Sequence, residues 1–421
     1  MSRADAAHSD DSGGYLDLLR REGDFRRVYL AGLVSLAGDW FAIVPLLTLL
    51  PRLTGTGIWG GLVLAADTAV LAMLSPYAGT VVDRVDRRKL MVGADLVSAG
   101  AVLLLLLVRS SATAWIALVA IGFVAAAKAF FAPASAAALP NLVDRADLSR
   151  ASVLSGSAWG SMLAIGAALG GAMDALLGPY WCFSIDAVSF GFSAWLTART
   201  TKPFGEAREP APRISMREDV RATMAYARGE PRVPALVLCK VGPGLGNGII
   251  SLFPLLAVVF GAGPLGTGLF FSVRGLGAVA GPLLMRRWVA RDESGLWRAL
   301  SISMVLFSLA YLGLSVTTSF AVALLLVFLG HVGAGSNWIL STYGLQAVVP
   351  DSLRGRVFSA DFMVVTIAIA VSQIGTGVLS EFVAPRRLTA GLAIVALAYS
   401  VAWLLATRQV RGRRPTRGGQ L

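Results

Sequence analysis

The chain has 421 residues, of which 56% are hydrophobic and 15% are charged, and its mean hydropathy is +0.69. This composition excludes a soluble globular domain and indicates a membrane protein. The net charge of +12 would suggest a nucleic-acid partner in a soluble protein, but here the basic residues fall in short segments between apolar runs, so we expect none.

The amino-terminal segment, residues 1–27, is polar and charged and lacks the short apolar core of a removable signal peptide. Beyond it the chain is organised in apolar runs of about 20 residues, the length that one helix needs to cross a bilayer. We count twelve such runs, over residues 28–50, 58–80, 90–108, 113–134, 153–175, 180–198, 235–260, 265–288, 297–317, 319–345, 357–381 and 386–407. The sequence therefore predicts an all-α membrane protein with about twelve transmembrane helices.

The long polar stretch 199–234 divides these helices into two groups of six, 28–198 and 235–407, and a basic tail, 408–421, follows. The groups resemble each other, because an offset of 206 residues places Arg150 on Arg356 and Gly171 on Gly377. We predict two pseudo-symmetric six-helix bundles joined by a cytoplasmic linker, an organisation that many transporters use to build a cavity between two bundles.

The basic residues are distributed unequally between the two sides of the predicted membrane. Only Arg52, Arg109, Arg386 and Arg387 fall in the loops on one side, whereas most of the 37 basic residues fall on the side of both termini. The positive-inside rule then predicts that both termini are cytoplasmic and that the protein is a multi-pass protein of the inner or plasma membrane.

The loop between the second and third predicted helices contains an ordered set of residues, Gly79, Asp83, Arg84, Arg87 and Arg88. The glycine permits close helix approach, the acid suits a helix N-terminus, and the arginines can make forked hydrogen bonds. We predict a latch at the cytoplasmic gate; a simple positive-inside loop would explain the charge but not the ordered glycine and acid. The second half keeps Gly281 but has Met285 where the acid would stand.

This loop resembles the signature of the major facilitator superfamily. Further matches extend over nearly the whole chain: Phe25-Arg26-Arg27, Gly38-Asp39-Trp40, Phe131-Ala132-Pro133-Ala134, Leu139-Pro140, Asp186-Ala187-Val188-Ser189-Phe190 and Leu353-Arg354-Gly355-Arg356-Val357. Together they resemble the branch that contains enterobactin-type siderophore exporters and macrolide-efflux proteins. The resemblance implies two six-helix bundles, alternating access and proton-coupled export.

The fifth predicted helix is rich in glycine, and its stretch from Gly166 to Gly171 resembles the antiporter signature of that superfamily. It departs from the signature at Ala167, where the family has proline. Close packing of two membrane helices on small residues explains the same stretch equally well.

Ionisable residues inside a membrane are expensive and are therefore candidates for function. Asp39, Asp67, Arg274 and His331 lie near the middle of predicted helices, and Lys128 lies too deep to reach the surface easily. We predict that these five residues couple protons or contact substrate, with Lys128 facing the cavity or an acid such as Asp39.

Two points about this set stay open. Asp67 and Arg274 occupy equivalent places in the two halves, which suits either a charged pair facing one cavity or a buried structural ion pair. His331 could titrate near neutral pH or could be a packing residue.

Four other intramembrane charges have simpler interpretations. Asp95, Lys240 and Asp361 are near the inner surface, where we expect them to pair with the basic loops. Asp186 is expected to serve packing.

The seventh predicted helix begins with Gly242, Pro243, Gly246 and Asn247 and later contains Pro254. Proline and glycine would bend or unwind it and free backbone groups that must then face protein or a water-filled cavity. We interpret this segment as a gate or binding element, with close packing as the alternative.

Several motifs of other protein classes are absent from the sequence. No lysine follows a glycine, so there is no Walker A loop, and there is no G-x-S-x-G or Cys-x-x-Cys motif. The only histidines are His8 and His331, and Cys182 and Cys239 lie in apolar runs. We therefore expect no enzyme, metal site or cofactor, with the proton gradient as the energy source.

The resulting hypothesis is a monomeric secondary transporter that exports a small organic molecule, such as a siderophore, an antibiotic or a drug-like compound, by proton antiport and alternating access. Asp39 and Asp67 would carry the proton or bind a cationic group, while Arg274 and Lys128 would hold an anionic group. The alternatives are import or lysolipid flipping on the same fold, and a membrane scaffold or sensor that transports nothing.

Overall fold

The computed structural model describes residues 14–82, 84–144, 147–204, 224–289 and 293–412. Within these ranges the regular structure is helical throughout, without strands. Among the described residues, eleven helical segments have the length and apolar character needed to cross a membrane. The fold is that of an integral membrane protein, as the composition predicts.

The first half contains a short helix and six long ones. Their bounds are α1 Tyr15–Arg21, α2 Gly23–Thr54, α3 Ile58–Val82, α4 Arg87–Leu104 with a 3-10 turn to Leu107, α5 Trp115–Leu142, α6 Leu148–Leu177 and α7 Pro179–Ala198. The last of these, α7, corresponds to the one predicted span that is not among the eleven, and it packs against α2 and α4. Most helices run several residues beyond the predicted apolar runs, because helical hydrogen bonding continues into the polar ends.

The second half repeats this plan, but its first span is interrupted. That span consists of α9 Arg232–Leu238, α10 Val241–Gly246, a 3-10 stretch Asn247–Leu252 and α11 Phe253–Val259. The remaining helices are α12 Gly263–Val289, α13 Glu293–Val316, α14 Phe320–Val348, α15 Asp351–Leu379, α16 Pro385–Ala406 and the short α17 Arg408–Gly412.

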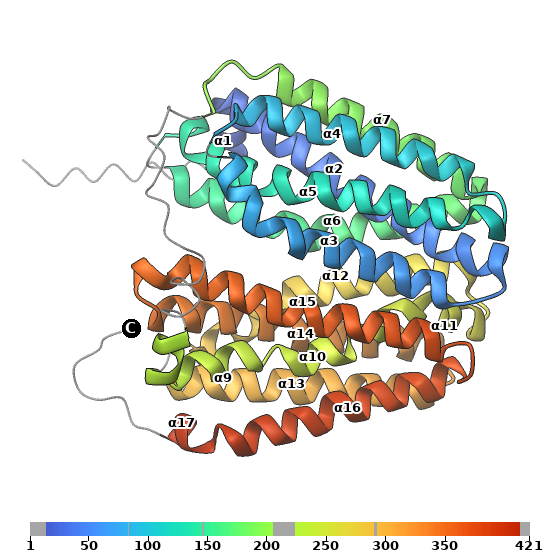
Figure 1. Cartoon of the computed structure of the whole chain (residues 1–421), viewed down its shortest axis with the longest axis vertical. Helices are drawn as coiled ribbons and strands as arrows, with labels where there is room; N and C mark the ends of the chain where they lie inside the picture. The colour runs from blue at the N-terminus through green and yellow to red at the C-terminus, as the bar shows by residue number, and fades with distance from the viewer. Residues whose placement is uncertain (1–13, 83, 145–146, 205–223, 290–292, 413–421) are drawn as a thin grey trace, which may run out of the picture.

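The two halves form two bundles that lie side by side, blue to green above yellow to red in Figure 1. They meet mainly along two helix pairs, α6 with α12 and α3 with α15. The helices α1, α9 and α17 all lie at one end of the molecule, on the left of Figure 1. We call this the terminal end, and the opposite end the far end.

Glycines allow the bundles to touch at the far end and near the middle. A Cβ at Gly171 of α6 would collide with the backbone of Pro264 and Gly268 in α12, and one at Gly61 of α3 with the backbone of α15. Close to the middle, Gly275 of α12 packs on the backbone of α6 in the same way. Only residues without a side chain permit helices to approach this closely.

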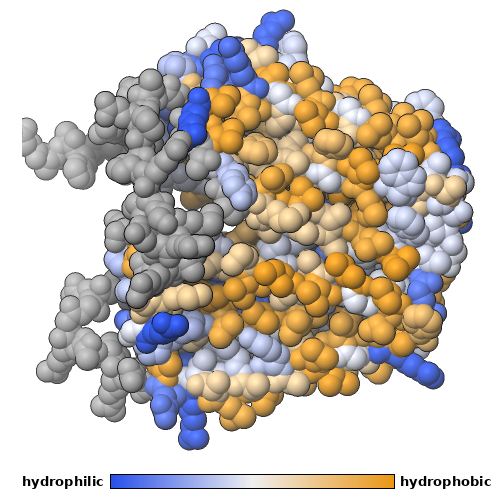
Figure 2. Space-filling view, in the orientation of Figure 1, coloured by the Kyte–Doolittle hydropathy of each residue, from blue (hydrophilic) through white to orange (hydrophobic). Residues whose placement is uncertain are grey.

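The buried apolar core has a different shape at the two ends. Towards the far end one cluster joins both bundles, for example Leu47 and Leu163 with Phe253 and Phe270. Towards the terminal end the core splits into two clusters, one in each bundle. Figure 2 shows the surface hollowed between the bundles on that side. Among the described residues, the structure is therefore closed at the far end and open at the terminal end.

Candidate functional site

Three of the predicted intramembrane residues meet in the middle of the first bundle. The Nζ of Lys128, on α5, lies 3.2 Å from Oδ2 of Asp39 on α2 and 3.2 Å from Oδ1 of Asp67 on α3. The Asp39 side chain is 5% exposed, whereas those of Asp67 and Lys128 are 26% and 25% exposed. The predicted contact between Lys128 and Asp39 is present, and Asp67 completes what we call the charged triad.

The charged triad carries two carboxylates against one ammonium. Lys128 donates a hydrogen bond to Asp67, while Oδ1 of Asp39 is buried without a hydrogen-bond partner among the described residues. A buried carboxylate oxygen without a donor is costly, and a proton or a cationic group would relieve that cost. The triad is thus chemically suited to bind a proton or an amine.

Arg274 and His331 form a second polar group, on the other bundle. Arg274, on α12, donates from Nε to Nε2 of His331 on α14 at 3.3 Å. Its guanidinium lies 5.3 Å from the ring centre of Trp40 and 5.8 Å from that of Trp159, both in the first bundle, and 5.9 Å from that of Phe271. Arg274 therefore reaches across the boundary between the bundles.

The possible pairing of Asp67 with Arg274 is not present. Asp67 is bound by Lys128 and Arg274 by His331, although both residues lie at equivalent places in their bundles. The repeat fixes the depth of a residue, but the rotation of each helix decides which neighbour it contacts. His331 is buried at 4% exposure and its Nδ1 also contacts Tyr311 and the carbonyl of Val327, so it occupies a fully packed position.

The sequence did not predict that Lys240 would pair with Asp361. The two side chains form an ion pair between the turn that joins α9 to α10 and helix α15. The Lys240 side chain is 1% exposed and that of Asp361 is 8% exposed. Thr342 accepts from Lys240 at 3.1 Å and the ring of Trp338 lies below it. The expectation that both would pair with the basic loops is wrong, because both side chains point into the bundle. Their opposite charges at similar depth were the signal that could have revealed the pair.

Asp95 is also buried rather than paired with a loop. It is 2% exposed and accepts a hydrogen bond of 2.6 Å from Ser193 of α7. Asp186 packs against Gly38 of α2 and accepts from Ser189, consistent with the packing role expected for it. These acids join α7 to the rest of the first bundle.

The first turn of α4 holds the beginning of the linker. Arg88 donates to the carbonyl of Lys202 at 2.7 Å, and Arg87 donates to the carbonyl of Phe204 at 2.9 Å. Arg84 and Gly79 are exposed, and Asp83 lies outside the described residues. Asp86, which the latch prediction did not include, caps α4 by accepting from the backbone of Arg88.

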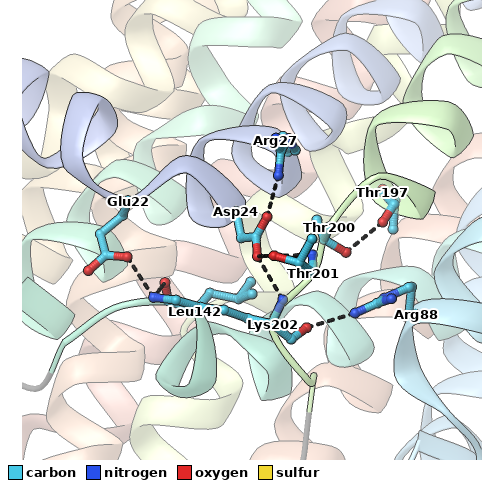
Figure 3. Close-up of polar contacts among 9 residues, drawn as sticks. All are labelled: Glu22, Asp24, Arg27, Arg88, Leu142, Thr197, Thr200, Thr201 and Lys202. Atoms are coloured by element: carbon cyan, nitrogen blue, oxygen red, sulfur yellow. Dashed lines mark hydrogen bonds and ion pairs between the residues drawn. The ribbon is translucent and has the colours of Figure 1, made fainter.

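Figure 3 shows that residues at the beginning of α2 also bind the beginning of the linker. Asp24 accepts from the backbone N–H groups of Thr201 and Lys202 at 3.0 and 2.7 Å, and Lys202 binds Glu22 at 2.7 Å. We call residues 200–204 the linker strap. In this open state the hydrogen bonds shown for Arg88 bind the strap, within the first half of the chain, and not the second bundle.

The predicted break in the seventh span is present, and it faces protein. Gly246 packs against Phe307, and the N–H of Gly248 donates to Ser372 of α15 at 2.9 Å. Asn247 accepts from Gln373 at 3.3 Å, and Gly242 and Pro243 are buried. Ser372 of α15 thus binds two backbone groups at this break, the N–H of Gly248 and the carbonyl of Leu245, as close packing would require.

Two six-helix bundles around a central hollow with intramembrane charges define a transporter of the major facilitator type. The chain belongs to the transmembrane secretion effector family of that superfamily, whose model matches residues 18–413.

Two relatives are similar over most of their length. A protein of Bacillus amyloliquefaciens named "Putative bacilysin exporter BacE" is 25% identical over 350 residues, which cover 81% of this chain and 84% of the relative. A protein of Bacillus subtilis strain 168 named "Uncharacterized MFS-type transporter YfiS" is 23% identical over 376 residues, covering 87% and 89%.

Solved transporters share the fold. A bacterial homologue of the human lysosomal transporter Spinster, in an inward-facing and unoccupied conformation, superposes with a TM-score of 0.75 at 13% identity, covering 94% of this chain and 99% of that one. A peptide transporter bound to alafosfalin gives a TM-score of 0.72 at 12% identity, covering 92% and 95%.

Proposed function

We propose that this protein exports a small organic molecule from the cytoplasm in exchange for protons. The observation that carries the proposal is the charged triad, which lies in the middle of the first bundle of a molecule that is open at the terminal end. The names of the BacE relatives, which describe exporters, support the direction of transport.

The terminal end is assigned to the cytoplasm by its charge. The far end carries Arg52, Arg109, Arg386 and Arg387, whereas the other described basic residues outside the spans lie at the terminal end. Under the positive-inside rule the hollow then opens to the cytoplasm, which is the state in which an exporter loads its cargo. The membrane is the inner or plasma membrane.

The charged triad couples cargo to protons by competition. With Lys128 between them, Asp39 and Asp67 hold one negative charge in excess, which either a proton or a cationic group of the cargo neutralises. Protons entering from outside would displace the cargo after the bundles rock to open the far end. The two bundles are contained in one chain, so a monomer suffices for this cycle.

The test uses bacilysin, the compound in the relatives' names, as the first candidate cargo. In everted membrane vesicles with an acid interior, we expect bacilysin to dissipate the proton gradient for the wild-type protein. Asp39→Asn and Asp67→Asn should each abolish this signal, which a pH-sensitive dye measures. The matched control is Asp17→Asn, which changes an exposed acid on α1, and this variant should transport normally.

The alternatives predict different outcomes. Accumulation of the cargo in right-side-out vesicles would favour import, and movement of a labelled lysolipid between leaflets would favour flipping. A scaffold would give no flux in either vesicle orientation with bacilysin or with a panel of siderophores and antibiotics, and Asp39→Asn and Asp67→Asn would both be silent.

A further inference from the structure

The guanidinium of Arg274 is a cation that has no acidic partner in the part of the chain that the structure describes. Among the described residues no carboxylate forms an ion pair with it, and its nearest partners are one imidazole and three aromatic rings. Its Nη1 is buried and has no hydrogen-bond partner there. Cation–π contacts offset part of the cost of removing a guanidinium from water, but an unpaired N–H remains expensive.

His331 orients Arg274 by binding its Nε, and the edge formed by Nη1 and Nη2 has no hydrogen-bond partner among the described residues. The Nδ1 of His331 lies 3.2 Å from the carbonyl oxygen of Val327, which can only accept, so the ring carries its proton on Nδ1. Nε2 is then the acceptor for Nε–H of Arg274. Neutral His331 therefore adds no compensating charge, and the edge formed by Nη1 and Nη2 remains for another partner. The Arg274 side chain as a whole is partly exposed.

The surroundings of that edge come from both bundles. Trp40 follows Asp39 on α2, Trp159 is on α6 and is 45% exposed, and Phe271 is on α12 with Arg274. Trp40 and Trp159 meet edge to face with their ring centres 6.5 Å apart. A flat apolar group can pack on these rings while an anion binds the guanidinium edge, because forked geometry favours planar carboxylates.

We infer that Arg274 binds a carboxylate of the cargo, with the apolar body of the cargo against Trp40 and Trp159. This inference rests on the proposed function and names its substrate class: an organic carboxylate with a flat or ring-shaped apolar part. Such a ligand would contact Arg274 in the second bundle and the tryptophans of the first. Its binding would therefore favour states in which the bundles approach each other around it.

The experiment measures equilibrium binding of radiolabelled 2-naphthoate to the purified full-length protein in lipid nanodiscs. We expect saturable binding to the wild type, and an affinity about tenfold or more lower for Arg274→Gln, since a charge-assisted hydrogen-bonded pair is lost. Arg274→Lys keeps the charge but loses the fork and should be intermediate. The neutral isostere 2-naphthamide should not compete.

The matched control is Arg109→Gln. Arg109 also lies over an aromatic ring, 3.7 Å from the centre of Tyr180, but it is exposed at the far end. Naphthoate binding should be unchanged in this variant. Size-exclusion profiles that match the wild type show that each variant is folded. If Arg274→Gln does not fold, Arg274→Lys replaces it as the test variant.

Two results would overturn the inference: equal competition by 2-naphthamide, or an affinity of both Arg274 variants within about twofold of the wild type. The proposed function fails separately. Naphthoate binding that depends on Arg274, without any proton-coupled flux, would support the carboxylate site and contradict the proposed export. Bacilysin flux that is insensitive to Arg274→Gln would support export and contradict the role of Arg274 in binding the cargo.

Discussion

At the scale of single residues, this protein contains two kinds of intramembrane charge. Asp67 and Lys128 are each about a quarter exposed, so the charged triad can exchange protons or ligands with its surroundings. Lys240 and Asp361 are almost completely enclosed, with Trp338 and Thr342 around them. The degree of enclosure separates a site that is open to chemistry from one that serves structure.

This difference leads to a prediction about stability. Lys240→Ala leaves the Asp361 carboxylate buried and unpaired, and removing one partner of a buried pair costs about 3–5 kcal/mol. We expect a clear loss of thermal stability in detergent, measured by differential scanning fluorimetry. The double variant Lys240→Met with Asp361→Leu should recover most of the loss, because no charge then remains buried.

Lys89→Ala is the control, since Lys89 is exposed in the first turn of α4, and it should melt like the wild type. A double variant that is no more stable than Lys240→Ala would contradict this prediction. It would mean that the attraction between Lys240 and Asp361 itself stabilises the second bundle, and not only the absence of an unpaired buried charge.

At the scale of elements, the linker strap is bound to the first bundle at its terminal end. Asp24 binds two of its N–H groups, Arg87 and Arg88 bind its carbonyls, and the ring of Phe204 is buried in the core cluster of that bundle. The linker therefore begins as an ordered part of the first bundle. The arginines of the family signature have a structural role in this open state.

We predict that Asp24→Asn together with Lys202→Ala releases the strap. The amide replaces a carboxylate acceptor, and the ion pair with Glu22 is lost, so the backbone of residues 200–204 should exchange hydrogen for deuterium faster. Hydrogen–deuterium exchange with mass spectrometry measures this directly.

The matched control for this experiment is Asp17→Asn, which removes an exposed acid from α1 and should leave exchange in the strap unchanged. Unaltered protection in the double variant would show that Arg87 and Arg88 alone are sufficient to hold the strap.

At the scale of the whole molecule, closure at the far end depends on glycine contacts between the bundles. Gly171 lies against Gly268, and Gly61 against Gly377, so the helices are separated by little more than their backbones. Towards the terminal end the core is divided between the bundles. Rocking about the middle would exchange the open and closed ends.

We predict that Gly171→Val shifts the molecule towards a state that is open at the far end, because the added side chain collides with the backbone of α12. Spin labels at Gly79 and Gly355, two positions at the terminal end with free space around their Cα atoms, should move closer together. Double electron–electron resonance measures this distance.

Gly191→Val is the control, because nothing lies within 4 Å of a Cβ at Gly191. Its distance distribution should match that of the wild type. An unchanged distribution for Gly171→Val would mean that the far end opens without separating α6 from α12.

The sequence by itself determined the approximate limits of the spans, their division into two similar groups, and the break near Asn247. These properties follow from local hydrophobicity, charge and the conformational limits of glycine and proline. It also placed Asp39, Asp67, Lys128, Arg274 and His331 at mid-membrane depth, and the contact of Lys128 with Asp39 could be predicted.

Only the tertiary structure decided the partners of the other charges. Lys128 also binds Asp67, Lys240 binds Asp361, and Arg274 stacks on Trp40 with no ion pair to any described acid. Depth is a property of position along one helix, which composition reveals. Contact depends on how each helix is rotated and which helix lies beside it, and that is fixed by packing of the whole bundle.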